Sequence, residues 1–252
     1  MADLPPYLSV TQVTTYLGCP RKYKFRYVEH REPEKRSGEL AFGSAVHSAI
    51  EWWAVSRMAG KPCSLDAVLR IFRVDWHAQI AAGDYDLDDK TPEEYATLGE
   101  ALVRLFYERF KDEVPIESES RFEVALREPE TGEPLPVNLV GFFDLAWDGL
   151  LGEIKTTAKK ASADTWGLQL AAYSYAWRER TGVRPRLRVV ELIKTKTPKL
   201  EIEELTLTDR DEAWFVEVAV EAYRSILAGA FHPNPGWMCG RCEYWRACRG
   251  AR

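Results

Sequence analysis

Residues 140–156 restrict the fold of this chain more than any other stretch, because two apolar strands flank a turn-forming pair, Asp148-Gly149. An Asp-Gly pair between apolar runs is a strong signal for a two-residue hairpin turn. With this turn, the residues on either side of it pair, and Asp144 lies directly opposite Glu153. Directly opposed side chains are roughly 5 Å apart, so two carboxylates in these positions repel each other. A divalent cation with oxygen ligands would remove this repulsion.

A lysine completes the candidate site on this hairpin. Lys155 follows Glu153 by two positions, so the two side chains share one face of the strand. Mg²⁺ or Mn²⁺ on clustered carboxylates promotes phosphodiester hydrolysis, and a nearby lysine can orient or deprotonate water or stabilise developing negative charge. The main-chain carbonyl of Ile154 is a candidate additional ligand. A surface cluster of salt bridges is the simpler alternative, but the flanking strands are too apolar for an exposed ribbon.

Three residues outside the hairpin are further candidates for the same site. Gln169 and Tyr173 are four apart on a predicted helix and share a face, where they could contact a phosphate or a water molecule. His47 lies within another predicted helix, and a neutral imidazole is a suitable ligand for Mn²⁺. For each residue alone, a place in the core or on a helix surface is the simpler interpretation.

The chain has five cysteines, and Cys239, Cys242 and Cys248 form a C-x2-C-x5-C pattern in a short C-terminal tail. An odd number of cysteines argues against a disulfide framework. Three closely spaced thiols in a tail with few apolar residues indicate a metal or cluster site. The fourth ligand would be Cys19 or Cys63. Zn²⁺ and an iron–sulfur cluster both suit thiolates, but a zinc ribbon would have a second C-x2-C pair, so the spacing favours the cluster.

The composition indicates a folded protein without a membrane span. Hydrophobic residues make up 46% of the 252 residues, and no apolar run approaches the roughly 20 residues that a membrane span needs. The N-terminus lacks the pattern of a signal peptide, so a cytoplasmic location is the default expectation. The net charge is −5, yet basic residues concentrate in segments 21–36 and 178–199. This segregation is compatible with phosphate-backbone binding or with ordinary solvated helix faces.

Local patterns predict a single mixed α/β domain with a central sheet flanked by helices. Helices are expected near residues 11–17, 40–58, 64–82, 91–111, 164–180 and 208–229, and strands near 115–126, 140–147, 150–156, 187–193 and 202–207. Residues 21–28 fit either a strand or a short helix. Residues 40–112 form a helical insertion, and residues 115–207 form the catalytic core.

In their order along the chain, these motifs resemble the RecB-like branch of the PD-(D/E)XK nuclease superfamily. Within it they are most similar to members with an iron–sulfur cluster, such as the AddB nuclease domain and the CRISPR-associated RecB-like exonucleases. The matching stretches are residues 8–23, Gly43–His47, Gly141–Asp144, Gly152–Lys155, Gln169–Tyr173 and the C-terminal cysteines. Each motif is weak alone, but six in the family's order are specific. One departure is Phe143, which precedes Asp144 where the family's pattern has proline.

The resemblance implies a restriction-endonuclease-like core and a role for each candidate residue. His47, Asp144 and Glu153 would hold the metal, and Lys155 would be catalytic. Gln169 and Tyr173 would contact the active site or the DNA.

The same resemblance implies a 4Fe-4S cluster and one more acidic residue. The cluster ligands would be Cys19, Cys239, Cys242 and Cys248, so that the cluster joins segments 1–30 and 231–252 in a clasp. The additional acidic residue upstream of the hairpin would be Glu119 or Glu123.

The resulting hypothesis is a Mg²⁺- or Mn²⁺-dependent deoxyribonuclease, an exonuclease rather than an endonuclease, acting on single-stranded or frayed DNA ends. DNA repair, recombination or CRISPR adaptation would be its setting, with DNA and the proteins of such a complex as partners and no membrane. The alternative is a non-catalytic DNA-binding or assembly module that retains the nuclease fold. The intact set of Asp144, Glu153 and Lys155 favours the enzyme, since a module without catalysis would be expected to lose it.

Overall fold

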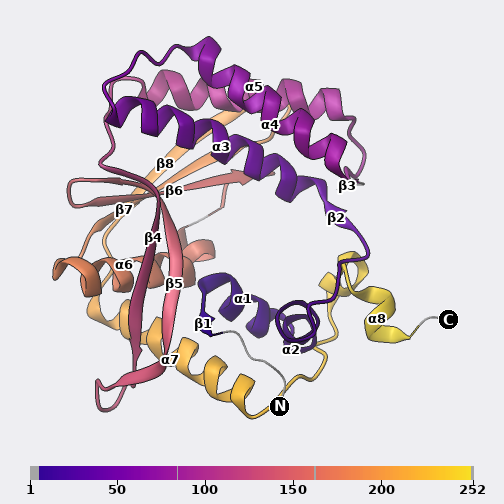
Figure 1. The fold of residues 1–252 in the computed structure, drawn as a ribbon, viewed down its shortest axis with the longest axis vertical. Coiled ribbons are helices and arrows are strands. Elements are labelled where there is room, and N and C mark those ends of the chain that lie inside the picture. Colours follow the sequence, from indigo (N-terminus) through magenta and orange to yellow (C-terminus); the bar gives the residue numbers. More distant parts are fainter. Residues whose placement is uncertain (1–5, 84, 162, 251–252) are drawn as a thin grey trace.

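A six-stranded mixed sheet lies between two layers of helices in the computed structural model, which describes residues 6–83, 85–161 and 163–250 (Figure 1). The strands are β1 (Tyr7–Leu8), β4 (Glu117–Arg127), β5 (Pro134–Trp147), β6 (Leu150–Thr157), β7 (Arg186–Ile193) and β8 (Lys199–Leu205). They follow the order β1-β5-β6-β7-β8, with β4 also paired to β5. The pairs β1–β5 and β6–β7 are parallel, and the others are antiparallel. This architecture confirms the coarser part of the predicted fold class, a mixed central sheet flanked by helices.

Three helices cover one face of the sheet: α3 (Gly38–Met58), α4 (Leu65–Ala82) and α5 (Pro92–Phe110) (Figure 1). Serine and threonine caps start all three, and α5 has a complete capping box. Helices α4 and α5 approach closely at Gly99, where an added Cβ atom would overlap the ring of Phe72. A short two-stranded sheet of β2 (Arg36–Ser37) and β3 (Tyr85–Asp86) lies at the edge of this layer.

Helices α1 (Val10–Gly18), α6 (Gly167–Thr181) and α7 (Asp209–Leu227) cover the other face. Strand β7 shows why both faces need a cover, because its apolar side chains alternate between the two cores. Leu187 and Val189 pack with α6 and α7, whereas Val190 and Leu192 pack with α3, α4 and α5. A central strand that is buried on both faces has apolar residues at consecutive positions, as β7 has from Val189 to Val190.

The predicted N-terminal cap of α6 is wrong, while its C-terminal end is as expected. The sequence pattern predicts Asp164 or Thr165 as the cap of this helix, but both lie within a 3-10 turn, η2 (Ala163–Trp166), and Trp166 occupies the cap position without a side-chain hydrogen bond. A residue already wound into a turn cannot take the extended conformation of a capping residue. Gly182 ends the helix in the left-handed conformation that favours glycine, at φ +76°.

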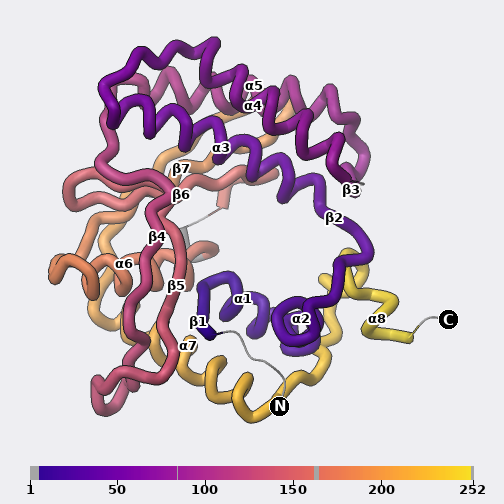
Figure 2. The backbone as a smooth tube through the Cα atoms, in the orientation of Figure 1, coloured from indigo at the N-terminus to yellow at the C-terminus, as the bar shows by residue number. Residues whose placement is uncertain are grey.

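The N-terminal and C-terminal segments lie side by side (Figure 2). The first continues through α2 (Pro20–Tyr23) and a π-helical turn, η1 (Lys24–Val28), and the second contains η3 (Trp237–Arg241) and α8 (Trp245–Arg249). The hydroxyl of Tyr16 donates to the carbonyl of Ala230 at 2.7 Å, and the rings of Tyr23 and Phe231 stack at 6.2 Å. Because α2 and η1 cover residues 21–28, this segment is a short helix rather than a strand.

Within the described residues, no helix is both long and apolar enough to cross a bilayer.

Candidate active site

The hairpin of β5 and β6 has the predicted register near its turn, with Trp147 paired to Leu150 and Gly149 at φ +64°. The paired positions end at Leu145 and Gly152. At the next residue of β5 away from the turn, the carboxylate of Asp144 accepts a hydrogen bond from the main-chain N–H of Ile154 at 2.7 Å. The predicted ladder pair of Asp144 with Glu153 is thus replaced by a bond from a side chain to the backbone, which orients the Asp144 carboxylate.

His47 of α3 reaches this point of the sheet from the layer of helices above it. Its Nε2 atom lies 3.1 Å from the carbonyl oxygen of Ile154, and its Nδ1 atom lies 3.4 Å from Glu119 Oε1 and 3.9 Å from Asp144 Oδ1. One ligand atom from each of His47, Glu119 and Asp144 lies within 4.8 Å of the others. Helix α3 and strands β4, β5 and β6 therefore converge on one group of candidate metal ligands.

Glu119 enters the group through an unusual backbone conformation. Its φ is +44°, in the left-handed region that non-glycine residues rarely adopt, although its neighbours on both sides pair with the residues that flank Asp144. Such strain in the middle of a strand is typical of functional sites. Glu123, the other candidate for the upstream acid, lies elsewhere and accepts a hydrogen bond from Asn138 at 2.8 Å.

A second network lies beside these ligands and contains the other predicted site residues. Gln169 of α6 donates to Glu153 Oε1 at 2.8 Å and to the Tyr173 hydroxyl at 2.9 Å, and its carbonyl accepts from Lys155 Nζ at 2.9 Å. Lys155 also forms an ion pair with Glu153. The ammonium group lies 5.1 Å from the ring centroid of Trp166, a contact that no sequence pattern predicts. Gln169 therefore orients the carboxylate and the ammonium group together.

The pKa shifts reflect crowded negative charge. Burial alone would lower the pKa of His47, but the carboxylates of Asp144, Glu119 and Glu153 outweigh it and raise the pKa of His47 to about 9. Burial and then the charge of Glu153 raise the pKa of Asp144 to about 7, against the opposing effect of His47. Repulsion between carboxylates at a shared site raises their pKa values in this way.

These residues fit a divalent cation. Glu153 is 3% exposed, and its Oε2 atom has no hydrogen-bond partner among the described residues. Buried carboxylate oxygens are normally satisfied, and an orphaned one beside further acidic ligands indicates an ion site. Carboxylate and carbonyl oxygens with one imidazole suit Mg²⁺ or Mn²⁺.

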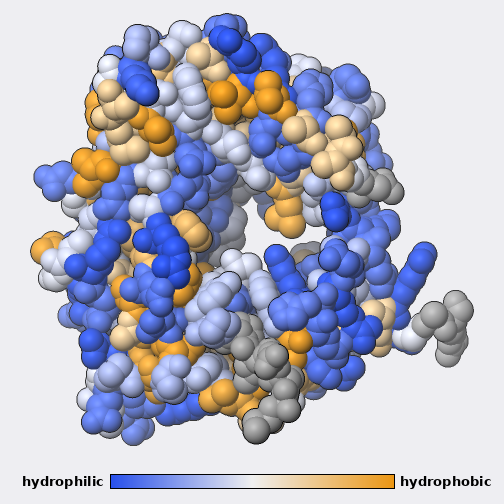
Figure 3. Space-filling model, in the orientation of Figure 1, coloured by the Kyte–Doolittle hydropathy of each residue, from blue (hydrophilic) through white to orange (hydrophobic). Residues whose placement is uncertain are grey.

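The ligand group opens into a cleft of about 600 Å³. Its lining comes from the end of β2, from α3, β4 and β6, and consists of Ser37, Glu39, Leu40, Gly43, Ser44, His47, Ser48, Glu51, Glu119, Ile154, Lys155 and Thr156. In the space-filling view, the molecule is hollowed between the α3 layer and the part that carries α1 and α2 (Figure 3). Both Lys155 and His47 are therefore accessible to a substrate from this side.

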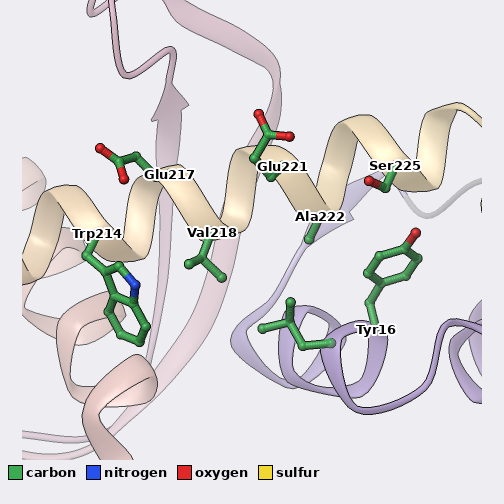
Figure 4. Close-up of a pocket in the computed structure, with 8 residues that line it drawn as sticks. Tyr16, Trp214, Glu217, Val218, Glu221, Ala222 and Ser225 are labelled. Atoms are coloured by element: carbon green, nitrogen blue, oxygen red, sulfur yellow. The ribbon is translucent and has the colours of Figure 1, made fainter. Parts of the chain in front are cut away.

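A smaller groove of about 390 Å³ lies between α1 and α7 (Figure 4). Its walls include Tyr16, Leu17, Trp214, Val218 and Ala222, with two glutamates on α7 at its edge. None of the candidate metal ligands lines this groove, so it is separate from the cleft at His47.

Three of the predicted cluster cysteines lie where the two ends of the chain meet. Cys19 Sγ accepts a hydrogen bond from the main-chain N–H of Asn234 at 3.4 Å. Burial chiefly raises the pKa of Cys242, and the thiol of Cys19 is near enough to contribute. Cys239 lies in η3 of the same segment. Cys248 follows, exposed, on α8.

Cys63 belongs to another part of the molecule, where its carbonyl accepts a hydrogen bond from Tyr107 of α5 at 2.8 Å. Cys19, rather than Cys63, therefore accompanies the C-terminal cysteines. In the part of the chain that the structure describes, no three thiols have sulfur atoms within 4.8 Å of one another.

The basic residues of segment 178–199 mostly form ion pairs with acidic residues from other elements. The pairs are Arg178 and Arg184 with Glu212, Arg180 with Glu117, Arg186 and Arg188 with Glu204, and Lys194 with Glu39. The positive charge of this segment is therefore largely neutralised in space, because α6, β7 and the residues after them lie against acidic partners. Little of this positive charge remains for a phosphate backbone.

Comparison with known proteins gives the family. A family model described as "PD-(D/E)XK nuclease superfamily" matches residues 7–249. The fold is similar to the crystal structure of a "Putative exonuclease" from Eubacterium rectale, with 17% identity, a TM-score of 0.62, and coverage of 98% of this chain and 90% of that chain. No curated protein sequence matches significantly. Since the family model spans nearly all described residues, the chain belongs to the PD-(D/E)XK nuclease superfamily, whose members use divalent metals.

Proposed function

We propose that this protein is a metal-dependent deoxyribonuclease that removes nucleotides from single-stranded or frayed DNA ends. One observation carries the proposal: the ligand group of His47, Glu119 and Asp144 adjoins the ion pair of Glu153 and Lys155 in an open cleft. The similarity in fold to a protein named as an exonuclease supports cleavage from ends.

In the proposed site, His47, Asp144, Glu153 and the carbonyl of Ile154 hold Mg²⁺ or Mn²⁺, with Glu119 as a further ligand. The cation would supply Lewis-acid stabilisation of the charge on a phosphoryl oxygen. The oxygen of a water molecule bonds to phosphorus while the bond from phosphorus to the leaving nucleotide breaks. A proton passes from this water to the leaving oxygen. The ammonium group of Lys155 stabilises the developing negative charge.

Gln169 and Tyr173 have supporting roles in this proposal. Gln169 contacts both Glu153 and Lys155 and is itself hydrogen-bonded to Tyr173. The three contacts of its single amide group restrict the rotamers of the carboxylate and the lysine. Such preorganisation places charge where it is needed in the transition state.

We further propose that Cys19, Cys239, Cys242 and Cys248 hold a 4Fe-4S cluster, as in the iron–sulfur branch of the RecB-like nucleases. The gathering of these cysteines at the junction of the chain ends supports a shared ligand. The C-x2-C-x5-C spacing, which lacks the second C-x2-C pair of a zinc ribbon, favours a cluster over the alternative, a single zinc ion. DNA repair, recombination or CRISPR adaptation is the proposed setting, where other proteins would assist.

The alternative function is a DNA-binding or assembly module without catalysis. The connected network of Glu153, Lys155 and Gln169 disfavours it, because a buried carboxylate is costly to retain without a use.

Cleavage of end-labelled DNA tests the proposal. The substrates are single- and double-stranded, linear and circular, in Mg²⁺, in Mn²⁺ and in EDTA. We expect release of label from linear single strands with either cation and none in EDTA. Lys155→Ala should abolish cleavage but retain DNA binding, whereas the surface variant Lys61→Ala should match the wild type. DNA binding without cleavage by the wild type would support the alternative.

A further inference from the structure

The short C-terminal segment exposes several large apolar side chains within nine residues. Trp237 is 87% exposed, Met238 56% and Trp245 40%, whereas Trp53 and Trp76 of the α3–α5 layer are fully buried. An indole offers one of the largest apolar surfaces in a protein, and clustered exposure of such side chains marks a binding surface.

Arginines accompany these indoles. The guanidinium group of Arg249 lies 4.3 Å from the ring centroid of Trp245. Residues 237–250 contain three arginines, all exposed, and a single acidic residue, Glu243, which pairs with Lys22. Flat aromatic faces beside positive charge are the combination on which the bases of a single strand stack while its phosphates are neutralised.

Backbone contacts place this segment at the rim of the catalytic cleft. The N–H of Glu34 donates to the carbonyl of Glu243 at 2.8 Å, and the N–H of Ala247 donates to the carboxylate of Glu34 at 3.0 Å. Ser37 already lines the cleft, and it is three residues from Glu34, or about 10 Å of extended chain. Figure 1 shows α8 beside the segment that leads through β2 into α3.

The cleft wall continues from there toward the metal ligands. Leu40 is 73% exposed and lines the cleft one turn after Ser37, and Gly43, Ser44 and His47 follow on α3. A single strand of DNA that is bound at the C-terminal segment has a path along α3 to His47.

We propose that Trp237 and Trp245 bind unpaired bases of the DNA substrate and hold the strand at the entrance to the cleft. This inference rests on the proposed function and assigns the residues that bind the unpaired bases of its substrate. A duplex stacks its bases internally and would offer only phosphates to the arginines. A lipid surface would need a longer apolar helix face than α8, which has five residues, provides.

Binding of a fluorescent oligothymidylate, measured by anisotropy in EDTA with the full chain, tests this inference. Trp237→Ala and Trp245→Ala should each weaken binding about fivefold or more, and Trp237→Phe should retain much of the affinity because it keeps a stacking face. Trp214→Ala is the matched control: Trp214 is 50% exposed but lies in the groove between α1 and α7 (Figure 4). It should bind like the wild type.

The outcomes separate this inference from the proposed function. Unchanged oligothymidylate binding in both alanine variants would overturn the inference, as would an equal loss of binding to a blunt duplex. Loss of binding to phosphatidylserine vesicles without loss of DNA binding would indicate a membrane surface and also overturn it. A wild-type protein that binds oligothymidylate through these tryptophans but cleaves no DNA would instead refute the proposed nuclease activity alone.

Discussion

The Nε2 atom of His47 lies 3.1 Å from the carbonyl oxygen of Ile154, so that α3 touches β6 at residues 107 positions apart. Both atoms are proposed ligands of the same cation. The position of α3 on the sheet therefore sets the distance between these two proposed ligands, and α3 in turn is held by the packing of α4 and α5.

Replacing the imidazole should weaken metal binding. We expect His47→Ala to raise the Mn²⁺ concentration for half-maximal cleavage by at least about tenfold, since even residues that only orient a ligand change metal affinity by about 10–100-fold. Titration of Mn²⁺ in the cleavage assay measures this shift. His77→Ala, an exposed histidine on α4, is the control and should leave the titration unchanged.

Removing the amide of Gln169 should slow cleavage while DNA still binds. Gln169→Ala releases both Glu153 and Lys155 from their common partner, and we expect kcat to fall about 10–100-fold. Tyr173→Phe keeps the amide of Gln169, and its kcat should fall less than that of Gln169→Ala. Equal losses in the two variants would show that the tyrosine hydroxyl, rather than the amide, organises the network.

The cysteines should differ in their effect on metal content. Purified aerobically, the wild type should be brown with about four iron atoms per chain, as a 4Fe-4S cluster requires. Cys19→Ser should lose the colour and lower the melting temperature, whereas Cys63→Ser should keep the colour. A colourless wild type with one zinc ion per chain would refute the cluster.

Glu212 should make stability depend on pH. Burial alone would raise the pKa of Glu212, but hydrogen bonds from Arg184, Ser174 and Arg178 outweigh it and lower the pKa below the usual 4.5. Its contribution to stability is thus complete above pH 4.5 and is lost as the pH falls through the lower folded-state value.

Urea unfolding of Glu212→Gln at two pH values measures this contribution. We expect a loss of about 1–2 kcal/mol at pH 7, because the partly exposed guanidinium groups of Arg178 and Arg184 lose their counter-charge, and a much smaller loss below pH 4. Glu217→Gln, exposed on the same helix, should change stability little.

Close packing at Gly99 predicts a steric effect. In Gly99→Ala the new methyl group would overlap the ring of Phe72, and we expect a loss of about 1–3 kcal/mol from overpacking. Gly167→Ala, whose new methyl group would have no neighbouring atom within 4 Å, should not destabilise. Thermal unfolding of both variants distinguishes packing from the intrinsic preference of helices for alanine.

Local signals were enough to predict the hairpin and most helix starts. The turn at Gly149 and the capping box of Thr208 with Asp211 depend on residues a few positions apart, so the sequence shows them directly. The same holds for Gln169 and Tyr173, which share a helix face and bond to each other.

Contacts across long separations could not be predicted in this way. The choice of Glu119 over Glu123 depends on a backbone conformation that no local pattern reveals. The pairing of Arg180 with Glu117 joins residues 63 positions apart, so the sequence alone left that arginine as a candidate for phosphate binding. Trp166 was missed because its role follows from the position of Lys155.

The left-handed backbone of Glu119 implies a trade-off between stability and activity. A non-glycine residue in this conformation costs about 1–2 kcal/mol, whereas glycine would adopt it freely. Glu119→Gly would therefore relieve the backbone strain and at the same time remove a carboxylate from the proposed metal site. Directed evolution for heat resistance alone should accept glycine at this position. The resulting protein would have a higher melting temperature but a lower nuclease activity.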